Sequence, residues 1–93
     1  MIQLAIHVDL LPDKLNEFNQ SWETFIQHKN TIKGLTWCHK NNLGNHSCDI
    51  ILQCNNQRQM DLFMQSEWYN FLMGAIQTLG DKSETKQIQH NKE

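Results

Sequence analysis

The sequence predicts an α+β domain of the ferredoxin-like βαββαβ class, in which a four-stranded antiparallel sheet carries both helices on one face. Three observations predict it. Apolar and polar residues alternate over residues 1–10, apolar residues recur at helical spacing in 11–30 and again in 60–79, and two alternating segments are joined by turn residues between 34 and 54. The 93 residues suit one small core, so we expect a single domain spanning 1–93.

The first strand is predicted at "MIQLAIHVDL". Its apolar face consists of Ile2, Leu4, Ile6, Val8 and Leu10, and its other face of Gln3, Ala5, His7 and Asp9. Such a period of two is typical of a strand buried on one side. Pro12 ends the strand and suits the first turn of a helix. That helix is predicted by the spacing of Leu15, Phe18, Trp22, Phe25 and Ile26, of which Phe18, Trp22 and Phe25 are assigned to the core.

A hairpin follows the first helix. Gly34 allows a sharp turn before "GLTWCHKNN", which alternates with Leu35, Trp37 and His39 on one face. The residues "LGNHS" supply a turn, and "CDIILQC" is the third strand.

The second helical region leads into "SEWYNFLMGAIQTLG". Ser66 followed by Glu67 resembles a new N-cap, so the helix is expected to break or kink just before Ser66. Gly74 in the middle of the helix indicates close packing, and Gly80 ends the helix. A last strand at "ETKQIQH" is expected at a sheet edge or a subunit contact.

This region carries more apolar surface than one sheet face can bury. One stripe consists of Met60, Met64, Trp68, Phe71, Leu72, Ala75 and Leu79, and a second of Leu62, Tyr69, Met73 and Ile76. With both helices on one side, the other face of the sheet would expose either Trp37 or its alternating neighbours to water. We therefore expect a homodimer in which two such open faces meet.

Composition excludes several classes of protein. The net charge is −2 and no basic run occurs, so the charge pattern does not indicate a nucleic-acid-binding surface. No segment resembles a signal peptide or a membrane span. Cys38, Cys48 and Cys54 form no CxxC pair and are expected to be reduced, inert thiols of a cytoplasmic protein. The histidines show no HxH or HxxxH spacing, so no metal site is expected.

The segment "MDLFMQSEWYNFLMGAIQTLG" resembles the helix-serine-helix segment of the antibiotic biosynthesis monooxygenase (ABM) family. Ser66 matches the characteristic serine, Tyr69 the following aromatic residue, and Leu72, Ala75 and Leu79 the apolar positions. The resemblance implies a dimeric α/β barrel. Several members of that family oxidise electron-rich phenols or hydroquinones without a metal or flavin, and the protein supplies a dry pocket, a base and hydrogen bonds to the phenolate.

The chain departs from the family pattern at three positions. Cys54 stands where many members have a tryptophan, and Phe63 where many have a histidine three residues before the serine. The haem-degrading relatives use a helical histidine, where this chain has Met73. Haem degradation is therefore not expected, and no cofactor is predicted.

His7 and His39 are the candidate catalytic residues, because each lies on a predicted strand and imidazole titrates near neutral pH. The alternative is that each is a strand histidine with a local hydrogen bond. Trp37, Tyr69, Phe63 and Trp68 are the candidate contacts for an aromatic substrate. For Trp68 the alternative is core packing, and for Trp37 a dimer contact.

Two functions remain open at this point. The first is a cofactor-independent monooxygenase, or a related oxidoreductase, acting on a small aromatic molecule in a pocket between the sheet and the helices. The second is a non-enzymatic dimeric module of the same fold that binds a small ligand or serves assembly. A cavity lined by His7, His39, Trp37 and Tyr69 would favour the enzyme, and a solidly filled interior would favour the module.

Overall fold

The computed structural model describes residues 1–89. Its elements are β1 (Ile2–Leu10), α1 (Leu15–Gln27), the short 3-10 helix η1 (Lys29–Thr31), β2 (Leu35–Asn42), β3 (Ser47–Cys54), α2 (Gln57–Met64), α3 (Glu67–Leu79) and β4 (Gly80–Gln89). The strands form one antiparallel sheet in the order β2-β3-β1-β4. The predicted ferredoxin-like arrangement is therefore confirmed.

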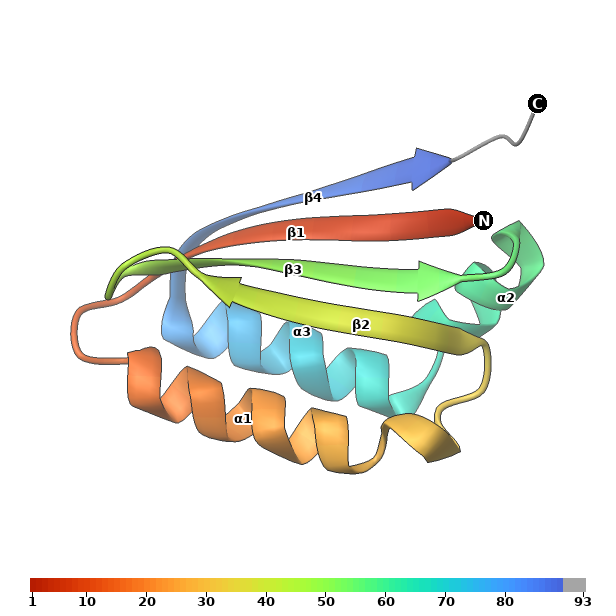
Figure 1. Ribbon diagram of the computed structural model, residues 1–93. Coiled ribbons are helices and arrows are strands. Elements are labelled where there is room, and N and C mark those ends of the chain that lie inside the picture. Colours follow the sequence, from red (N-terminus) through yellow and green to blue (C-terminus); the bar gives the residue numbers. More distant parts are fainter. Residues whose placement is uncertain (90–93) are drawn as a thin grey trace.

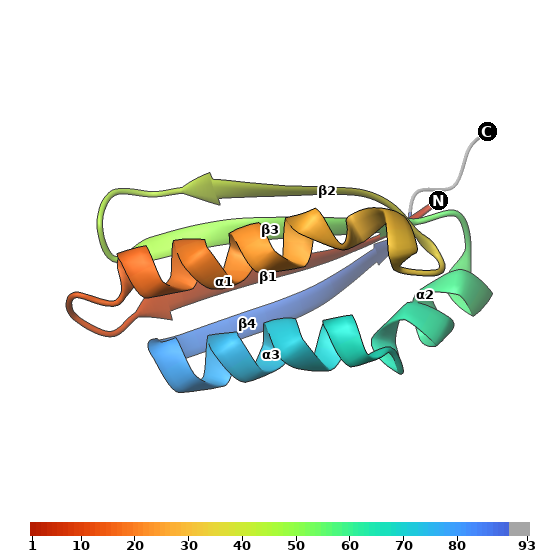
Figure 2. The same cartoon turned by 90° about the horizontal axis from the view of Figure 1, so that it is seen from below.

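The helices cover only one face of this sheet. Figure 1 shows α1 and α3 in a layer beneath the strands, and the view from below shows the two helices side by side across the sheet (Figure 2). The opposite face carries no helix (Figure 1). We call this second surface the open face.

The core lies between the sheet and the helices. The apolar face of β1 is buried along its whole length, as the alternation predicts. From the helices, Phe18, Phe25 and Phe63 are completely buried, and Trp22 is 6% exposed. Burying one such side chain contributes about 1.5–3 kcal/mol to the stability of the fold. These rings fill the space between the two layers.

The predicted helix break at Ser66 is confirmed. Helix α2 ends at Met64 and α3 begins at Glu67. The Ser66 hydroxyl accepts a hydrogen bond from the backbone N–H of Tyr69 at 3.2 Å and donates one to the backbone oxygen of Phe63 at 2.6 Å. One serine thus caps the start of α3 and holds the end of α2.

Two element boundaries differ from the predictions. Helix α1 begins at Leu15, because Asp13 has φ 62° and this left-handed conformation cannot continue a helix from Pro12. Strand β4 begins at Gly80, earlier than the predicted 84–90, and pairs with β1 along its length. The last residue of that predicted strand, His90, lies outside the described residues.

A β-bulge changes the predicted faces of β2. Leu35 pairs with Cys54 and Trp37 with Gln53, so Thr36 is an extra residue in this strand. Leu35 therefore turns toward the core, against which it packs, and does not share a face with Trp37. Simple alternation predicted that these two side chains lie together.

Two glycines have opposite roles. Gly34 has φ +90°, and a Cβ there would lie 2.7 Å from the backbone oxygen of Gln59, so the turn into β2 requires glycine. At Gly74 a Cβ would meet no atom within 4 Å. The prediction that Gly74 permits close packing is therefore wrong, because its surface is open to solvent.

Candidate functional site

The open face of the sheet brings polar side chains from several strands together. On β1 these are His7 and Asp9, which alternate with the buried residues and lie on the same face as the apolar Ala5. Across the sheet, Asp49 on β3 lies opposite His7, and Ile51 lies opposite Ala5. Trp37 on β2 also faces outward and is 48% exposed, so of the two alternatives for this strand it is Trp37 that the open face displays to water.

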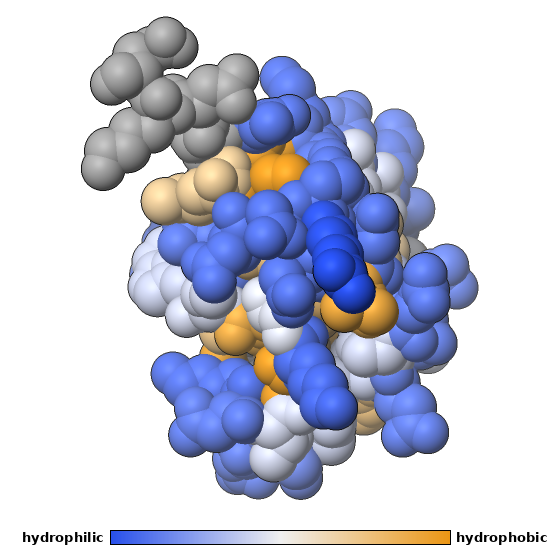
Figure 3. All heavy atoms as spheres, turned by 90° about the vertical axis from the view of Figure 1, so that its right-hand side faces the viewer, coloured by the Kyte–Doolittle hydropathy of each residue, from blue (hydrophilic) through white to orange (hydrophobic). Residues whose placement is uncertain are grey.

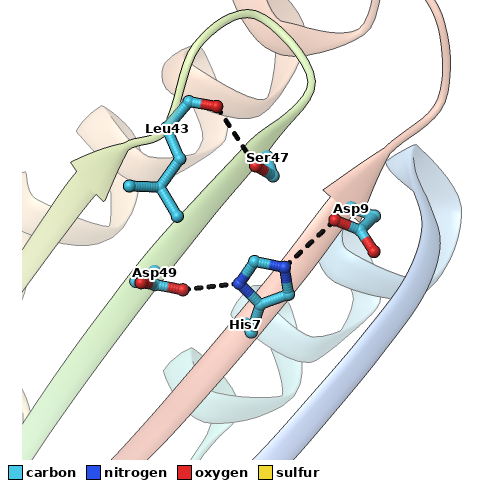
Figure 4. Close-up of polar contacts among 5 residues, drawn as sticks. All are labelled: His7, Asp9, Leu43, Ser47 and Asp49. Atoms are coloured by element: carbon cyan, nitrogen blue, oxygen red, sulfur yellow. Dashed lines mark hydrogen bonds and ion pairs between the residues drawn. The ribbon is translucent and has the colours of Figure 1, made fainter.

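His7 is held between two carboxylates. Its Nδ1 lies 2.6 Å from Oδ1 of Asp49 on the neighbouring strand, and its Nε2 lies 3.0 Å from Oδ1 of Asp9 on the same strand. Figure 4 shows the imidazole ring between the two acidic side chains. All three side chains are about half exposed, at 42%, 49% and 48% for His7, Asp9 and Asp49. This arrangement is a charged cluster open to solvent on one side.

The two carboxylates favour the protonated form of His7. The hydrogen bond to Asp49 is the largest cause that raises the pKa of His7, and the hydrogen bond to Asp9 is the next. Desolvation acts in the opposite direction and is smaller than either bond. When both ring nitrogens donate, His7 is an imidazolium. His7 becomes a base only after one of its ring nitrogens loses its proton.

A hollow of about 270 Å³ borders this cluster on the open face. Ala5 and Ile51 contribute apolar surface, and His7, Asp49, Glu84 and Lys86 contribute the polar groups. A second hollow of about 260 Å³ is lined by His7, Asp9, Lys82, Ser83 and Glu84. His7 therefore borders both hollows, with apolar surface on one side and charges on the other.

Trp37 and His39 form a second aromatic group on this face. Their rings stack with centroids 5.9 Å apart and an interplanar angle of 13°. His39 lies opposite Ile51, which in turn lies opposite Ala5, two residues from His7. With strands about 4.8 Å apart and a rise of about 3.4 Å per residue, the Cα atoms of His7 and His39 are roughly 12 Å apart. One hydroxyl group cannot contact both imidazoles.

The other expected contacts lie on the helix side of the sheet. Phe63 is completely buried, with its ring edge-on to Phe25 at 6.5 Å and to Tyr69 at 5.3 Å. Tyr69 is half-buried, and burial raises the pKa of its hydroxyl. Trp68 stacks on His28 with ring centroids 4.1 Å apart. Phe63, Tyr69 and Trp68 therefore line no cavity with His7, and Phe63 belongs to the core.

A larger groove lies on the outer surface of the helices. It has a volume of about 630 Å³ and runs between α1 and α3. Its lining includes Ser21 and Thr24 from α1, and Phe71, Gly74 and Thr78 from α3. No charged residue other than Glu17 lines it, and none of the candidate site residues does. The groove is separated from His7 by the whole core.

The cysteines are not activated. Burial raises the pKa of Cys48 and Cys54 to about 11, and desolvation also raises the pKa of Cys38. All three are free thiols, as expected from their spacing.

In the part of the chain that the structure describes, no group of three or more histidine, cysteine or carboxylate side chains could hold a metal ion. Within residues 1–89, no helix is long and apolar enough to cross a membrane.

Sequence reasoning placed His7 on this face but did not single out its two partners. Asp9 could have been found, because residues two apart on a strand share a face. Asp49 could not, since its place beside His7 depends on the pairing of β1 with β3, a contact between residues 42 apart in the sequence.

Solved structures with the same architecture include one of an antibiotic biosynthesis monooxygenase. Its TM-score is 0.83 over 99% of this chain and 100% of that chain, at 7% sequence identity. The chain has the ABM fold. SnoaB, a cofactor-independent oxygenase from Streptomyces nogalater, has this fold too, with a TM-score of 0.82, 10% identity, and coverage of 99% of this chain and 94% of SnoaB.

A similar fold also occurs in a protein of unknown function, NE2512 from Nitrosomonas europaea, which gives a TM-score of 0.82 at 11% identity, over 94% of this chain and 85% of that chain. No family model matches the sequence. No curated protein matches it either. At these identities the comparisons establish the ABM fold, and the activity has to be argued from the site.

Proposed function

We propose that this protein is a cofactor-independent monooxygenase, or a closely related oxidoreductase, that acts on a small phenol-like or hydroquinone-like aromatic molecule. The observation that carries the proposal is the His7–Asp49 pair beside a hollow with apolar surface. An oxygenase among the proteins that share the ABM fold adds support. The proposed site lies on the open face, because aromatic core side chains occupy the space between sheet and helices.

The surface around His7 offers what an aromatic substrate needs. The apolar surface of Ala5 and Ile51 suits the face of an aromatic ring, and His7 lies at one end of it. Trp37 and His39 lie farther along the same face, across β3. A substrate with one or two rings would fit over this surface with a hydroxyl at His7.

The chemistry requires a base and molecular oxygen but no external reductant. Neutral His7 takes the proton of a substrate hydroxyl at Nε2, and the resulting phenolate passes one electron to O₂. The phenoxyl radical and superoxide combine at a ring carbon that carries a hydrogen, and the resulting peroxide anion takes the proton back from His7 to give a hydroperoxide. Loss of water from that carbon leaves a carbonyl group. One oxygen atom enters the product, and the other leaves as water with two hydrogens of the substrate.

A second copy of the chain would close this site. On the described chain the hollows beside His7 are open at the surface, whereas the proposed chemistry needs water to be excluded. We propose that two open faces meet in a homodimer, which would also cover Trp37. The dimer is thus part of the proposed function.

A non-enzymatic ligand-binding or assembly module is the second candidate. The specific observation in its favour is that both ring nitrogens of His7 already contact carboxylates, so no free base faces a ligand. The filled sheet–helix layer also fits a structural module. The two candidates differ in whether His7 changes the rate of any reaction.

Oxygen uptake tests the proposal. Purified protein is mixed with dihydroxynaphthalenes, anthrones and simple hydroquinones, and each rate is compared with the spontaneous rate. We expect uptake that His7→Ala lowers about 10²- to 10⁴-fold, the usual contribution of a general base. His39→Ala tests the other candidate base, and His46→Ala, on an exposed loop, is the matched control. A stable dimer without uptake on any substrate, or equal rates in all variants, would favour the module.

A further inference from the structure

The two carboxylates beside His7 differ in where they lie relative to it. Both are on inner strands, and Asp49 on β3 is directly opposite His7 in the β1–β3 pairing. Asp9 lies two residues from His7 on β1, at the point where the pairing with β4 shifts register. The two contacts also differ in length, at 2.6 Å for Asp49 and 3.0 Å for Asp9.

We propose that Asp49 and Asp9 are positioning residues for His7 with separate tasks. Asp49 fixes the ring and keeps a proton on Nδ1, while Asp9 occupies Nε2 until a substrate hydroxyl takes its place. This inference rests on the proposed function, since it concerns the same base. It adds two residues to the site, and it states which ring nitrogen reacts.

The role of Asp49 follows from hydrogen-bond chemistry. A carboxylate can only accept, so a ring nitrogen has to keep its proton to hold such a contact, and we expect the shorter one, at 2.6 Å from Nδ1 against 3.0 Å from Nε2, to keep it. When His7 loses one proton, the proton on Nε2 therefore leaves, and the free lone pair points toward Asp9. The carboxylate of Asp49 then stabilises the imidazolium that forms when His7 takes the substrate proton.

The role of Asp9 follows from its second possible partner. Lys82 on β4 lies opposite Asp9 in the β1–β4 pairing, and both line the hollow of about 260 Å³ beside His7. A substrate hydroxyl that donates to Nε2 can displace the carboxylate of Asp9 toward the ammonium of Lys82.

Three further charged groups surround His7. Glu84 on β4 is paired directly opposite His7, and Lys82 and Lys86 flank it on the same strand. On β3 the facing group is Asp49. Glu84 makes no hydrogen bond to His7 within the described residues. Glu84→Gln is therefore a matched control, because it removes a carboxylate from the same surface without breaking a contact of the ring.

Nuclear magnetic resonance of ¹⁵N-labelled His7 tests the inference without any substrate. In wild type and in Asp9→Asn we expect the neutral ring to carry its proton on Nδ1. In Asp49→Asn we expect the proton on Nε2, where Asp9 accepts it. Both variants should lower the pKa of His7, and Glu84→Gln should change it less than either. A neutral wild-type ring protonated on Nε2, or equal pKa values in wild type and Asp9→Asn, would overturn the proposal.

Kinetics then separate the two tasks. At pH values where His7 is mostly protonated, Asp9→Asn should raise kcat/KM severalfold, because more of the enzyme has a free Nε2. Asp49→Asn should lower kcat about 10- to 100-fold even above the pKa of His7, because the wrong nitrogen faces the substrate. Equal kcat in wild type and Asp49→Asn would contradict this role. If no substrate is turned over, the monooxygenase proposal fails, while the tautomer measurement still decides what the two carboxylates do.

Discussion

Replacing Phe63 by alanine tests whether the space between sheet and helices is a core or a pocket. Phe63 is completely buried and contacts Phe25 and Tyr69 edge-to-face. Truncating such a ring costs about 3–5 kcal/mol, since the apolar contacts are lost and a cavity remains. For a domain of this size each kcal/mol lowers Tm by about 4–8 °C, so Phe63→Ala should lower Tm by roughly 12–40 °C.

Urea unfolding followed by circular dichroism, at one protein concentration, measures the free energy of unfolding. Phe71→Ala is the matched control, because Phe71 lies on α3 but is 39% exposed, and its truncation should cost about 1 kcal/mol. Phe63→Leu gives a milder change if the alanine variant does not fold. If Phe63→Ala and Phe71→Ala lowered the free energy of unfolding equally, the space between the sheet and the helices would not be a filled core. The substrate site would then be expected in that space.

Three other outcomes follow from the structure. Gly74→Ala should raise the free energy of unfolding by about 0.5–1 kcal/mol in a chemical denaturation experiment, because the helix gains an alanine and no atom obstructs its Cβ; a loss would mean that another molecule packs there. The stabilising effect of His7 should be complete below its ordinary pKa of 6.5 and should disappear as pH rises through the raised folded value. The difference in unfolding free energy between wild type and His7→Gln should therefore shrink as pH rises above 6.5, and a growing difference would contradict the pKa direction. Trp37→Asp should weaken the proposed dimer at least about tenfold in sedimentation equilibrium, while Leu62→Asp, equally exposed but on α2, should not; equal dissociation constants would place the interface elsewhere.

Hydrophobic residues are scattered over the end of the molecule that carries α2. Figure 3 shows this end as mostly hydrophilic, with separate hydrophobic spots instead of one continuous patch. Leu62 is exposed, but single exposed apolar residues are ordinary on protein surfaces. The open face is therefore the better surface for both the ligand and the second copy.

The fold could be predicted because its signals are local. The alternation in β1, the helical spacing in α1 and the serine cap at Ser66 each depend on neighbouring residues, and each is confirmed. The bulge at Thr36 could not be predicted, because it arises from pairing with β3. The prediction that Gly74 permits close packing was wrong for a similar reason, since the space around a helical glycine depends on its tertiary neighbours.

The site could be predicted only in part. His7 and His39 do lie on the open face with Trp37, as their strand positions indicated. The aromatic residues of the helical region lie on the other side of the sheet, because the helices cover only one face. A strand pattern shows which face a residue is on, but it does not show which residues on other strands surround it.

The central claim is that the aromatic ligand binds on the open face beside His7. Chemical-shift mapping of labelled protein with a dihydroxynaphthalene, kept under nitrogen to prevent turnover, tests it most directly. The account predicts shifts at Ala5, Ile51 and His39, and displacement of the Asp9 contact at His7. Shifts confined to Ser21 and Gly74, which line the groove between α1 and α3, or no saturable shifts at all, would contradict it.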